Sequence, residues 1–278
     1  MTKRQLIFIL GMHRSGTSVL TRCLNLQGVT LPKTIMLPQK DNEKGFWESL
    51  PIVRFNNRLL KEAGVAWDDP KPIAASWWQS SEIPEWINQA SLLLQQEFSY
   101  GELVVLKDPR LSRLMPIWIE ACKKTDFSPL VLLCCRNPLD VASSLERRNE
   151  FNLQHAERLW LRYMLEAEKG SRGLVRSVVH FDNLIDNWKD TIEQACTNIG
   201  LEMPLLKGDV ADKINAFISP NLIHHNAKKA SHLYDNDKLE SLAKDTYEGF
   251  FHKLLDECVF DDLLSRLNHA DLIELLAG

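Results

Sequence analysis

One short segment near the amino end constrains the fold more than any other. Residues 11–18 read Gly-Met-His-Arg-Ser-Gly-Thr-Ser, directly after the apolar run 6–10 and before a helical pattern. A strand, a loop of small residues and a helix in this order hold a phosphate against the helix N-terminus. The spacing matches the Walker A frame, but Thr17 stands where that frame has its lysine, and the nearest fixed cation is Arg14. The segment therefore predicts a phosphate site unlike that of P-loop nucleoside triphosphatases.

Three later apolar runs, at 103–106, 130–135 and 178–181, have the composition of buried parallel strands, and helical patterns lie between them. This alternation predicts an α/β fold, a P-loop-type open parallel sheet with helices on both sides. Ligands of such sheets bind at the carboxyl ends of the strands. Polar clusters follow the first three of the four runs, at 13–15, 107–110 and 136–138. We therefore expect at least four cations at one edge of the sheet.

The rest of the chain is predicted to belong to the same single domain, 1–278. Residues 28–81 are rich in proline and tryptophan and interrupt the alternation, so they predict an irregular insertion with one helix near 53–63. We expect this insertion to form the substrate region. Residues 207–278 carry helical patterns at 239–255 and 261–276, which predict a helical C-terminal extension.

Composition narrows the class of protein. The chain has 278 residues, 45% of them hydrophobic, and a net charge of -4, which argues against a long nucleic-acid or acidic-membrane surface. Its six cysteines form no Cys-x-x-Cys pair, so we expect reduced core thiols and a cytoplasmic location. No apolar run is long enough for an integral membrane segment. The histidines at 224, 225 and 232 lack a supporting ligand spacing, so no metal is expected.

A second anion site is predicted after the third strand. Arg136 precedes Ser144 by eight positions, and Pro138 between them suits the first turn of a helix that runs to about Arg148. One guanidinium and one hydroxyl at this separation can grip a phosphate distinct from that of the glycine loop, residues 11–16. Two separate anion sites in a fold without the P-loop lysine indicate a nucleotide with two phosphorylated positions.

With these motifs in order, the chain resembles sulfotransferases that depend on 3′-phosphoadenosine 5′-phosphosulfate (PAPS). Residues 14–18 resemble the family loop for the 5′-phosphosulfate, and residues 136–144 resemble its 3′-phosphate motif. Together with 45–48 (Gly-Phe-Trp-Glu) and 107–110 (Lys-Asp-Pro-Arg), they are similar to bacterial members of the glycan and protein sulfotransferase branch. The likeness spans roughly residues 6 to 186.

The resemblance implies a PAPS-dependent enzyme, with PAPS as co-substrate and 3′-phosphoadenosine 5′-phosphate as product. It implies transfer of a sulfuryl group to an acceptor hydroxyl or amine, with Arg14 and Lys107 stabilising charge on the leaving nucleotide. Glu48 fits the position of the general base, and Asp108 and His13 are the alternatives. The residues expected to bind the nucleotide are His13, Arg14, Ser15, Gly16, Thr17, Ser18, Arg136 and Ser144.

The sequence also departs from one branch of that family. Cytosolic small-molecule sulfotransferases have a lysine at the position of Arg14, and their catalytic histidine motif corresponds here to Lys107-Asp108-Pro109. Their Gly-rich nucleotide loop near the C-terminus is not evident in this sequence, and residues 223–229 are the candidate for its place. These departures argue against phenol and steroid acceptors. A carbohydrate or glycolipid acceptor is expected from the branch and from the tryptophans of the insertion, although core or lid packing also accounts for those tryptophans.

Two other functions remain open. A P-loop small-molecule kinase using ATP and Mg²⁺ accounts for the strand, loop and helix, but not for the missing lysine or for Arg136 and Ser144. A catalytically silent nucleotide-binding protein would bind the bisphosphate and transfer nothing. The partner of the enzyme is a small-molecule or glycan acceptor, and the sequence gives no signal for an oligomeric state.

Overall fold

Four parallel strands form the central sheet in the computed structural model, which describes residues 3–39, 42, 44–202, 208–218, 237–252 and 256–277. The strands are β1 (Arg4–Leu10), β2 (Leu103–Lys107), β3 (Phe127–Cys135) and β4 (Val175–His180). Within the described residues their order is β2-β1-β3-β4, and Ile7 of β1 pairs with Val105 on one side and Leu130 on the other. The predicted α/β fold with an open parallel sheet is confirmed.

Both faces of the sheet are covered, because successive side chains of a strand point to opposite faces. In β1, Leu6, Phe8 and Leu10 belong to one apolar cluster, while Ile7 and Ile9 belong to the other. The same alternation holds along β3. A strand buried on both sides needs an unbroken apolar run, and such runs are what the sequence shows.

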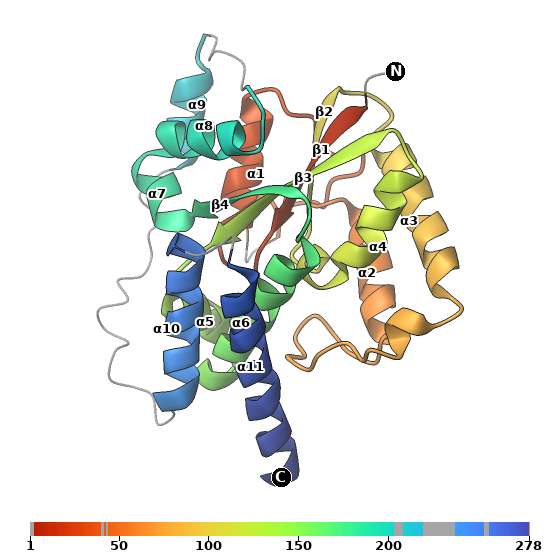
Figure 1. Ribbon diagram of the computed structural model, residues 1–278. Coiled ribbons are helices and arrows are strands. Elements are labelled where there is room, and N and C mark those ends of the chain that lie inside the picture. Colours follow the sequence, from red (N-terminus) through yellow and green to blue (C-terminus); the bar gives the residue numbers. More distant parts are fainter. Residues whose placement is uncertain are drawn as a thin grey trace.

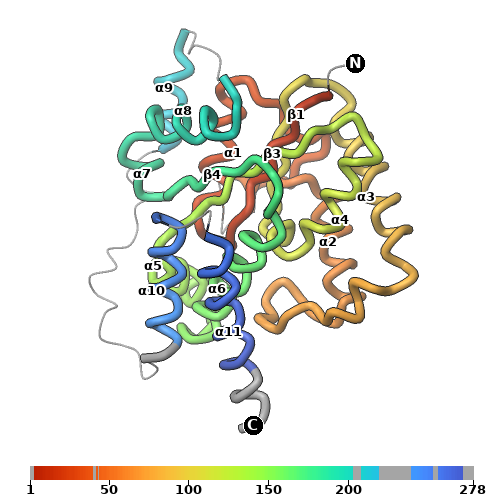
Figure 2. The backbone as a smooth tube through the Cα atoms, viewed as in Figure 1, coloured from red at the N-terminus to blue at the C-terminus, as the bar shows by residue number. Residues whose placement is uncertain are grey.

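Helices complete the two layers (Figure 1). One face packs against α1 (Thr17–Leu26), α7 (Phe181–Asp186), α8 (Trp188–Asn198) and α9 (Val210–Phe217). The other packs against α2 (Leu50–Glu62), α3 (Ile83–Glu97), α4 (Leu111–Lys123), α5 (Pro138–Asn149), α6 (Leu153–Gly170), α10 (Asp237–His252) and α11 (Glu257–Ala277). A short 3-10 turn, η1 (Trp77–Gln79), lies in the connection between α2 and α3, which passes beside α6 (Figure 2).

Helix starts follow the local sequence. The Asn137 side chain accepts a hydrogen bond from the Leu139 N–H (2.9 Å) and caps α5, whose first residue is Pro138. This helix ends at Asn149, one residue beyond the predicted end. In α2, Ser49 caps the Ile52 N–H (3.3 Å), so the helix predicted near 53–63 is present and begins at Leu50.

The last strand differs from its prediction at both ends. The apolar run predicted a strand over 178–181, whereas β4 begins at Val175 and ends at His180, and Phe181 starts α7. Val175 is exposed at the edge of the sheet, and the Arg176 guanidinium pairs with Glu168 at 3.0 Å. An edge strand alternates polar and apolar residues, so its first half lacks the apolar signal on which the prediction relied.

The segment after α1 runs along the free edge of β2. The Thr30 N–H donates to the Leu103 carbonyl (3.0 Å), and the Thr30 carbonyl accepts from the Val105 N–H (2.9 Å). These bonds cover part of the outer edge of β2, which would otherwise present unpaired backbone groups. Further along, the Met36 N–H donates to the Glu48 carbonyl at 2.8 Å. The first part of the insertion is therefore tied to the sheet beside the end of β2.

The cysteines are mostly core residues. Five of the six are buried, and burial raises the pKa of the Cys23 and Cys134 thiols to about 12. Cys258 is exposed at the start of α11, so the expectation that all six are core thiols is wrong there. In the described parts of the chain, no helix has the length and apolar character needed to cross a bilayer.

Candidate functional site

The glycine loop joins β1 to α1 in a conformation that two glycines permit. Gly11 has φ 141°, and a Cβ there would lie 2.5 Å from the Cys134 carbonyl oxygen. Gly16 has φ 88°, and a Cβ there would lie 2.1 Å from the Phe181 ring. The loop is held from β3 by the Cys134 thiol, which donates to the Ser15 carbonyl (3.0 Å). The loop thus packs directly on β3 and α7 and presents the N-terminus of α1, which has no acidic residue in its first turn.

Two segments predicted to bind anions meet at this loop. Arg14, at φ 70°, donates from Nε to the Ser144 hydroxyl of α5 (2.9 Å), 130 positions away in the chain. Arg136 donates from Nη1 to the Arg14 carbonyl (3.0 Å) and places its guanidinium 4.5 Å from the centre of the Phe181 ring. The guanidinium of Arg136 therefore lies on the same side of the sheet as the glycine loop, within one hydrogen bond of it.

The polar groups around this meeting point are incompletely satisfied. Within the described residues, the Ser15 hydroxyl and the Arg136 Nε are buried and have no hydrogen-bond partner. Burial lowers the pKa of Arg136, while the carboxylates of Asp140 and Asp182 oppose that change. Buried donors without partners cost free energy, and they are common where a polar ligand completes the site. The arrangement suits an anion.

A second cluster lies at the end of β2. The Lys107 ammonium donates to the Glu48 carboxylate (2.5 Å), the Ser18 hydroxyl (3.2 Å) and the Phe46 carbonyl (3.2 Å). Lys107 is 3% exposed and Glu48 is 4% exposed. Burial raises the pKa of Glu48, Asp108 adds to that rise, and the cations of Lys107 and Arg110 oppose it. Lys107 thus connects the first turn of α1 to a buried carboxylate.

Asp108 has a different environment from Glu48. It is fully buried and accepts from the Asn56 amide (2.9 Å), from the Arg110 N–H (3.1 Å) and from the Arg110 guanidinium (2.8 Å). The side-chain oxygen Oδ1 of Asn56 in turn accepts from the Trp118 indole N–H (3.0 Å). These contacts hold Asp108 between α2 and α4, with its oxygens occupied by protein donors.

His13 lies beneath the insertion. Its ring is 4.8 Å from that of Trp67 and 6.0 Å from that of Tyr163, measured between centroids, and its Nε2 has no hydrogen-bond partner in the part of the chain that the structure describes. The pKa of His13 is held well below its ordinary value, first by burial and then by the positive charges of Arg110, Lys107, Arg148 and Arg14. His13 is therefore neutral at physiological pH, and its low basicity makes it a weak proton acceptor.

The structure thus brings the predicted residues to one edge of the sheet, at the carboxyl ends of β1, β2 and β3. Thr17 and Ser18 begin α1, and Lys107 ends β2. Residues 223–229, the candidate nucleotide segment, lie outside the described residues. Sequence reasoning missed four residues that contact the site: Asn56 at Asp108, Ser112, whose hydroxyl accepts from the Gly11 N–H (2.9 Å), Tyr163 at His13 and Phe181 at Arg136. Only Phe181 had a usable signal, because it ends an apolar run at the carboxyl end of a strand.

No group of three or more metal-ligating His, Cys, Asp or Glu side chains occurs within the described ranges.

No protein-family model and no curated protein matches the chain. Among solved structures, the fold is similar to the sulfotransferase domain from the Synechococcus PCC 7002 olefin synthase. The TM-score is 0.51 and the identity 17%, over 91% of this chain and 96% of that one. The sulfotransferase domain from the curacin biosynthetic pathway gives 0.50 and 16%, over 91% and 99%. These likenesses show the fold of the chain.

Proposed function

We propose that this protein transfers a sulfuryl group from PAPS to a hydroxyl or amine of a carbohydrate or glycolipid. The observation that carries the proposal is the meeting of two anion-binding segments, in which Arg14 contacts Ser144 and Arg136 contacts the Arg14 carbonyl. A nucleotide phosphorylated at both the 3′ and 5′ positions can engage both segments at once. The similarity of the fold to two sulfotransferase domains supports the same conclusion.

The nucleotide is proposed to bind through backbone and side-chain donors. The N–H groups of Gly16, Thr17 and Ser18 at the start of α1 hold the 5′-phosphate, because a helix N-terminus carries unpaired donors and a partial positive charge. Arg136 and Ser144 hold the 3′-phosphate through charge-assisted hydrogen bonds. His13 and Ser15 complete the proposed nucleotide-binding set, and the Ser15 hydroxyl is buried without a hydrogen-bond partner among the described residues.

In the reaction, the acceptor oxygen or nitrogen forms a bond to sulfur while the bond from sulfur to the bridging phosphate oxygen breaks. The electron pair of that bond remains on the bridging oxygen, where Arg14 and Lys107 stabilise the negative charge. The acceptor proton passes to Glu48, the general base. The products are a sulfated acceptor and 3′-phosphoadenosine 5′-phosphate.

The contacts of Lys107 support Glu48 as the proposed general base. Lys107 shares its ammonium between Glu48 and the Ser18 hydroxyl at the first turn of α1. An anion at the glycine loop draws this positive charge away from Glu48, and burial already raises the pKa of the carboxylate. Glu48 is therefore better suited than Asp108, whose oxygens are occupied by Asn56 and Arg110.

The carbohydrate acceptor is proposed from the aromatic side chains beside the loop. Trp67 lies against His13, and Trp47 precedes Glu48 in the chain. A flat ring with one polar N–H can contact both the C–H faces and the hydroxyls of a sugar. This part of the proposal is tested by comparing carbohydrate acceptors with phenols in the transfer assay.

The decisive experiment is calorimetry with 3′-phosphoadenosine 5′-phosphate and, separately, with ATP plus Mg²⁺. Binding of the bisphosphate without a comparable response to ATP is expected. Tight ATP binding with no response to the bisphosphate would identify a kinase instead. A protein that binds the bisphosphate but transfers no labelled sulfate from PAPS to any acceptor would be a silent nucleotide-binding protein.

A further inference from the structure

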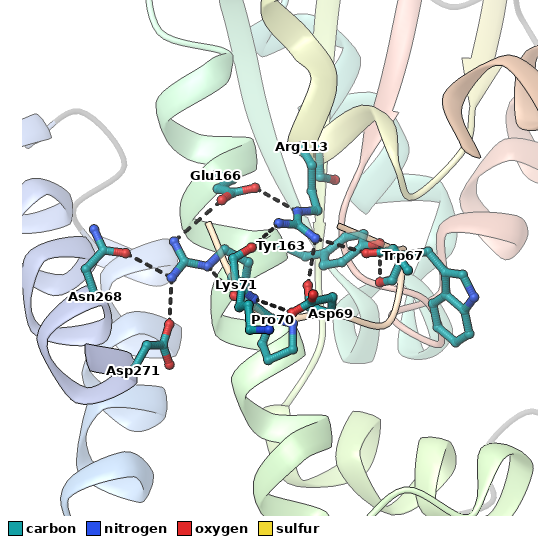
Figure 3. A network of polar contacts seen from close by, with 12 residues as sticks. Trp67, Asp69, Pro70, Lys71, Arg113, Tyr163, Glu166, Asn268 and Asp271 are labelled. Atoms are coloured by element: carbon teal, nitrogen blue, oxygen red, sulfur yellow. Dashed lines mark hydrogen bonds and ion pairs between the residues drawn. The ribbon is translucent and has the colours of Figure 1, made fainter. Parts of the chain in front are cut away.

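The connection between α2 and α3 is held by an unusual set of donors. Five of its backbone carbonyls, within the clamped segment 66–71, accept hydrogen bonds from three side chains of α4 and α6 (Figure 3). Arg113 donates to the carbonyls of Ala66, Asp69 and Lys71, Arg162 to that of Pro70, and the Tyr163 hydroxyl to that of Trp67. A loop with this many tertiary bonds to its main chain has one fixed path over the sheet edge.

The two arginines are themselves fixed by carboxylates. The side chain of Arg113 is 0% exposed and that of Arg162 is 1% exposed, so each needs a partner for its charge. Glu166 joins them, with 2.9 Å to Arg113 Nε and 3.5 Å to Arg162 Nη1. Asp271 of α11 completes the set at 2.8 Å from Arg162 Nη2 (Figure 3). Separating such a buried pair would leave a charge without compensation, which costs free energy. The arginine side chains are therefore held in one position.

The C-terminal helix thereby reaches the clamped segment. Asn268 of α11 accepts from Arg162 Nη2 at 2.9 Å, beside Asp271. Neither residue contacts the glycine loop. Both residues contact Arg162, which bonds to Pro70 on its other side, and Asp271 also lies 3.8 Å from the Arg158 guanidinium.

The clamped segment rests on the glycine loop. The Trp67 ring lies 4.8 Å from His13 and 5.9 Å from Phe151, and Arg113 lies 5.7 Å from the centre of the Tyr163 ring, whose other neighbour is His13. His13 directly precedes Arg14, which has a left-handed backbone with φ 70°. A non-glycine residue in that conformation is retained only when its surroundings enforce it. Trp67 and Tyr163 are the rings that fix its neighbour.

We propose that Arg113 and Arg162, locked by Glu166 and by Asn268 and Asp271 of α11, are positioning residues for the glycine loop. They act through Trp67 and Tyr163 on His13, and so keep Arg14 and the donors of the loop in place for an anion. The effect on bisphosphate affinity rests on the proposed function, whereas the effect on the loop itself does not.

The test compares two variants of α11. Asp271→Ala removes the carboxylate from Arg162 and from the more distant Arg158, whereas Asn268→Ala removes a hydrogen bond from Arg162. Arg266→Ala is the control. It also removes an ion-paired side chain of α11, but Arg266 pairs with Asp245 of α10 and Asp262 of α11 at the surface. Amide hydrogen exchange is followed in peptides covering 64–72 and 10–16, together with the melting temperature. Asp271→Ala is expected to speed exchange in both peptides, and Arg266→Ala in neither.

A second readout is the dissociation constant of 3′-phosphoadenosine 5′-phosphate. Coupling through a packed network of this kind typically changes affinity by roughly 2- to 30-fold, so Asp271→Ala is expected to weaken binding within that range. If Asp271→Ala does not fold, Asn268→Ala removes a single hydrogen bond from Arg162 and takes its place.

The outcomes separate the two proposals. Faster exchange confined to 64–72, or unchanged exchange throughout, overturns the positioning role. If the wild-type protein binds no bisphosphate, the proposed function fails, and the exchange of the 10–16 peptide still decides the inference. An effect of equal size in Arg266→Ala would show general loosening of α11 and would also overturn it.

Discussion

Arg136 is the residue on which the proposed second anion site depends. Its guanidinium stacks on Phe181 and donates to the Arg14 carbonyl, so it is oriented before any ligand arrives. Preorganised donors lose little entropy on binding, which makes their removal costly. Sequence spacing predicted Arg136 and Ser144 as partners for a phosphate, but it could not show that Arg14 contacts Ser144 directly.

Arg136→Ala is expected to weaken binding of 3′-phosphoadenosine 5′-phosphate by about 1.5–3 kcal/mol, the range for a hydrogen bond to a charged group. Calorimetry measures this loss. The control is Arg147→Ala, which removes the same charge from the exposed last turn of α5. Equal losses in both variants would show that net charge, rather than a specific contact, governs binding.

Glu48→Gln is expected to reduce the rate of sulfuryl transfer by about 10²–10⁴, the usual contribution of a general base. Affinity for the bisphosphate should stay within about twofold, because the amide oxygen still accepts from Lys107. Asp108→Asn is the comparison, and we expect it to act mainly on the melting temperature through its bonds to Asn56 and Arg110. Full transfer activity in Glu48→Gln would exclude it as the base.

Gly16→Ala is expected to lower the free energy of unfolding by about 2–5 kcal/mol. The positive φ costs about 1–2 kcal/mol and the collision with the Phe181 ring adds about 1–3 kcal/mol. Gly173→Ala is the matched control, because Gly173 has φ 78° but a Cβ there would meet nothing within 4 Å. If urea denaturation gives the same loss of unfolding free energy for Gly16→Ala and Gly173→Ala, the collision with the Phe181 ring contributes nothing.

At the scale of helices and strands, the apolar runs carried most of the information. Strands β1, β2 and β3 are buried on both faces, so their composition alone indicated them, and Pro138 indicated the start of α5. The edge strand β4 was located only in part, since its first residues face solvent or pair with Glu168. Which helices pack against each other has no such local signal in the sequence. The contact between α6 and α10 is an example.

Glu157 of α6 lies against α10 with neither carboxylate oxygen bonded to any described residue. Burial raises its pKa to about 7, and the like charge of Glu240 adds to the rise. The folded state therefore holds this proton more tightly than the unfolded state. The stability it confers is complete below the ordinary pKa of 4.5 and is lost as pH rises through 7.

The amide introduced by Glu157→Gln cannot ionise. The unfolding free energy of this variant, relative to that of wild type, should therefore rise between pH 5 and pH 8 by up to about 3 kcal/mol. Urea denaturation at the two pH values measures the difference. Glu146→Gln, an exposed change of the same kind on α5, is the control and should show no such trend. If the unfolding free energies of Glu157→Gln and wild type differ by the same amount at both pH values, the raised pKa of Glu157 is contradicted.

At the scale of the whole molecule, the site is assembled where three parallel strands end. The alternation of strands and helices predicted this, because it fixes which ends of the strands meet. What the sequence could not show is how distant parts brace the site. Arg113 and Arg162 bond to backbone carbonyls, which every residue possesses, so no spacing of residue types marks them. Away from the site, Glu168 connects α6, β4 and α11 through ion pairs that the sequence did not indicate either.

Glu168 is fully buried and pairs with Arg172 (2.8 Å) and Arg176 (3.0 Å), and Arg172 continues to Asp261 of α11 (2.9 Å). Glu168→Ala leaves two guanidinium groups without this partner and is expected to cost about 3–5 kcal/mol of unfolding free energy. Chemical denaturation tests this, with Glu248→Ala as control, whose exposed pair with Lys244 is worth less than about 1 kcal/mol. A loss for Glu168→Ala no larger than that of the control would mean that the pair is dispensable.

The position of β1 between β2 and β3 has a consequence for synthesis on the ribosome. Residues 4–10 emerge before the strands that flank them, and both hydrogen-bonding edges of β1 stay open until residues 103–135 have left the exit tunnel. The hydroxyl that meets Arg14 appears later still, at position 144. A nascent polypeptide therefore carries an apolar strand without neighbours for more than a hundred residues of elongation, the period when chaperones shield such segments. A translation product stalled before that point would lack the contact between Arg14 and Ser144 on which the proposed nucleotide site rests.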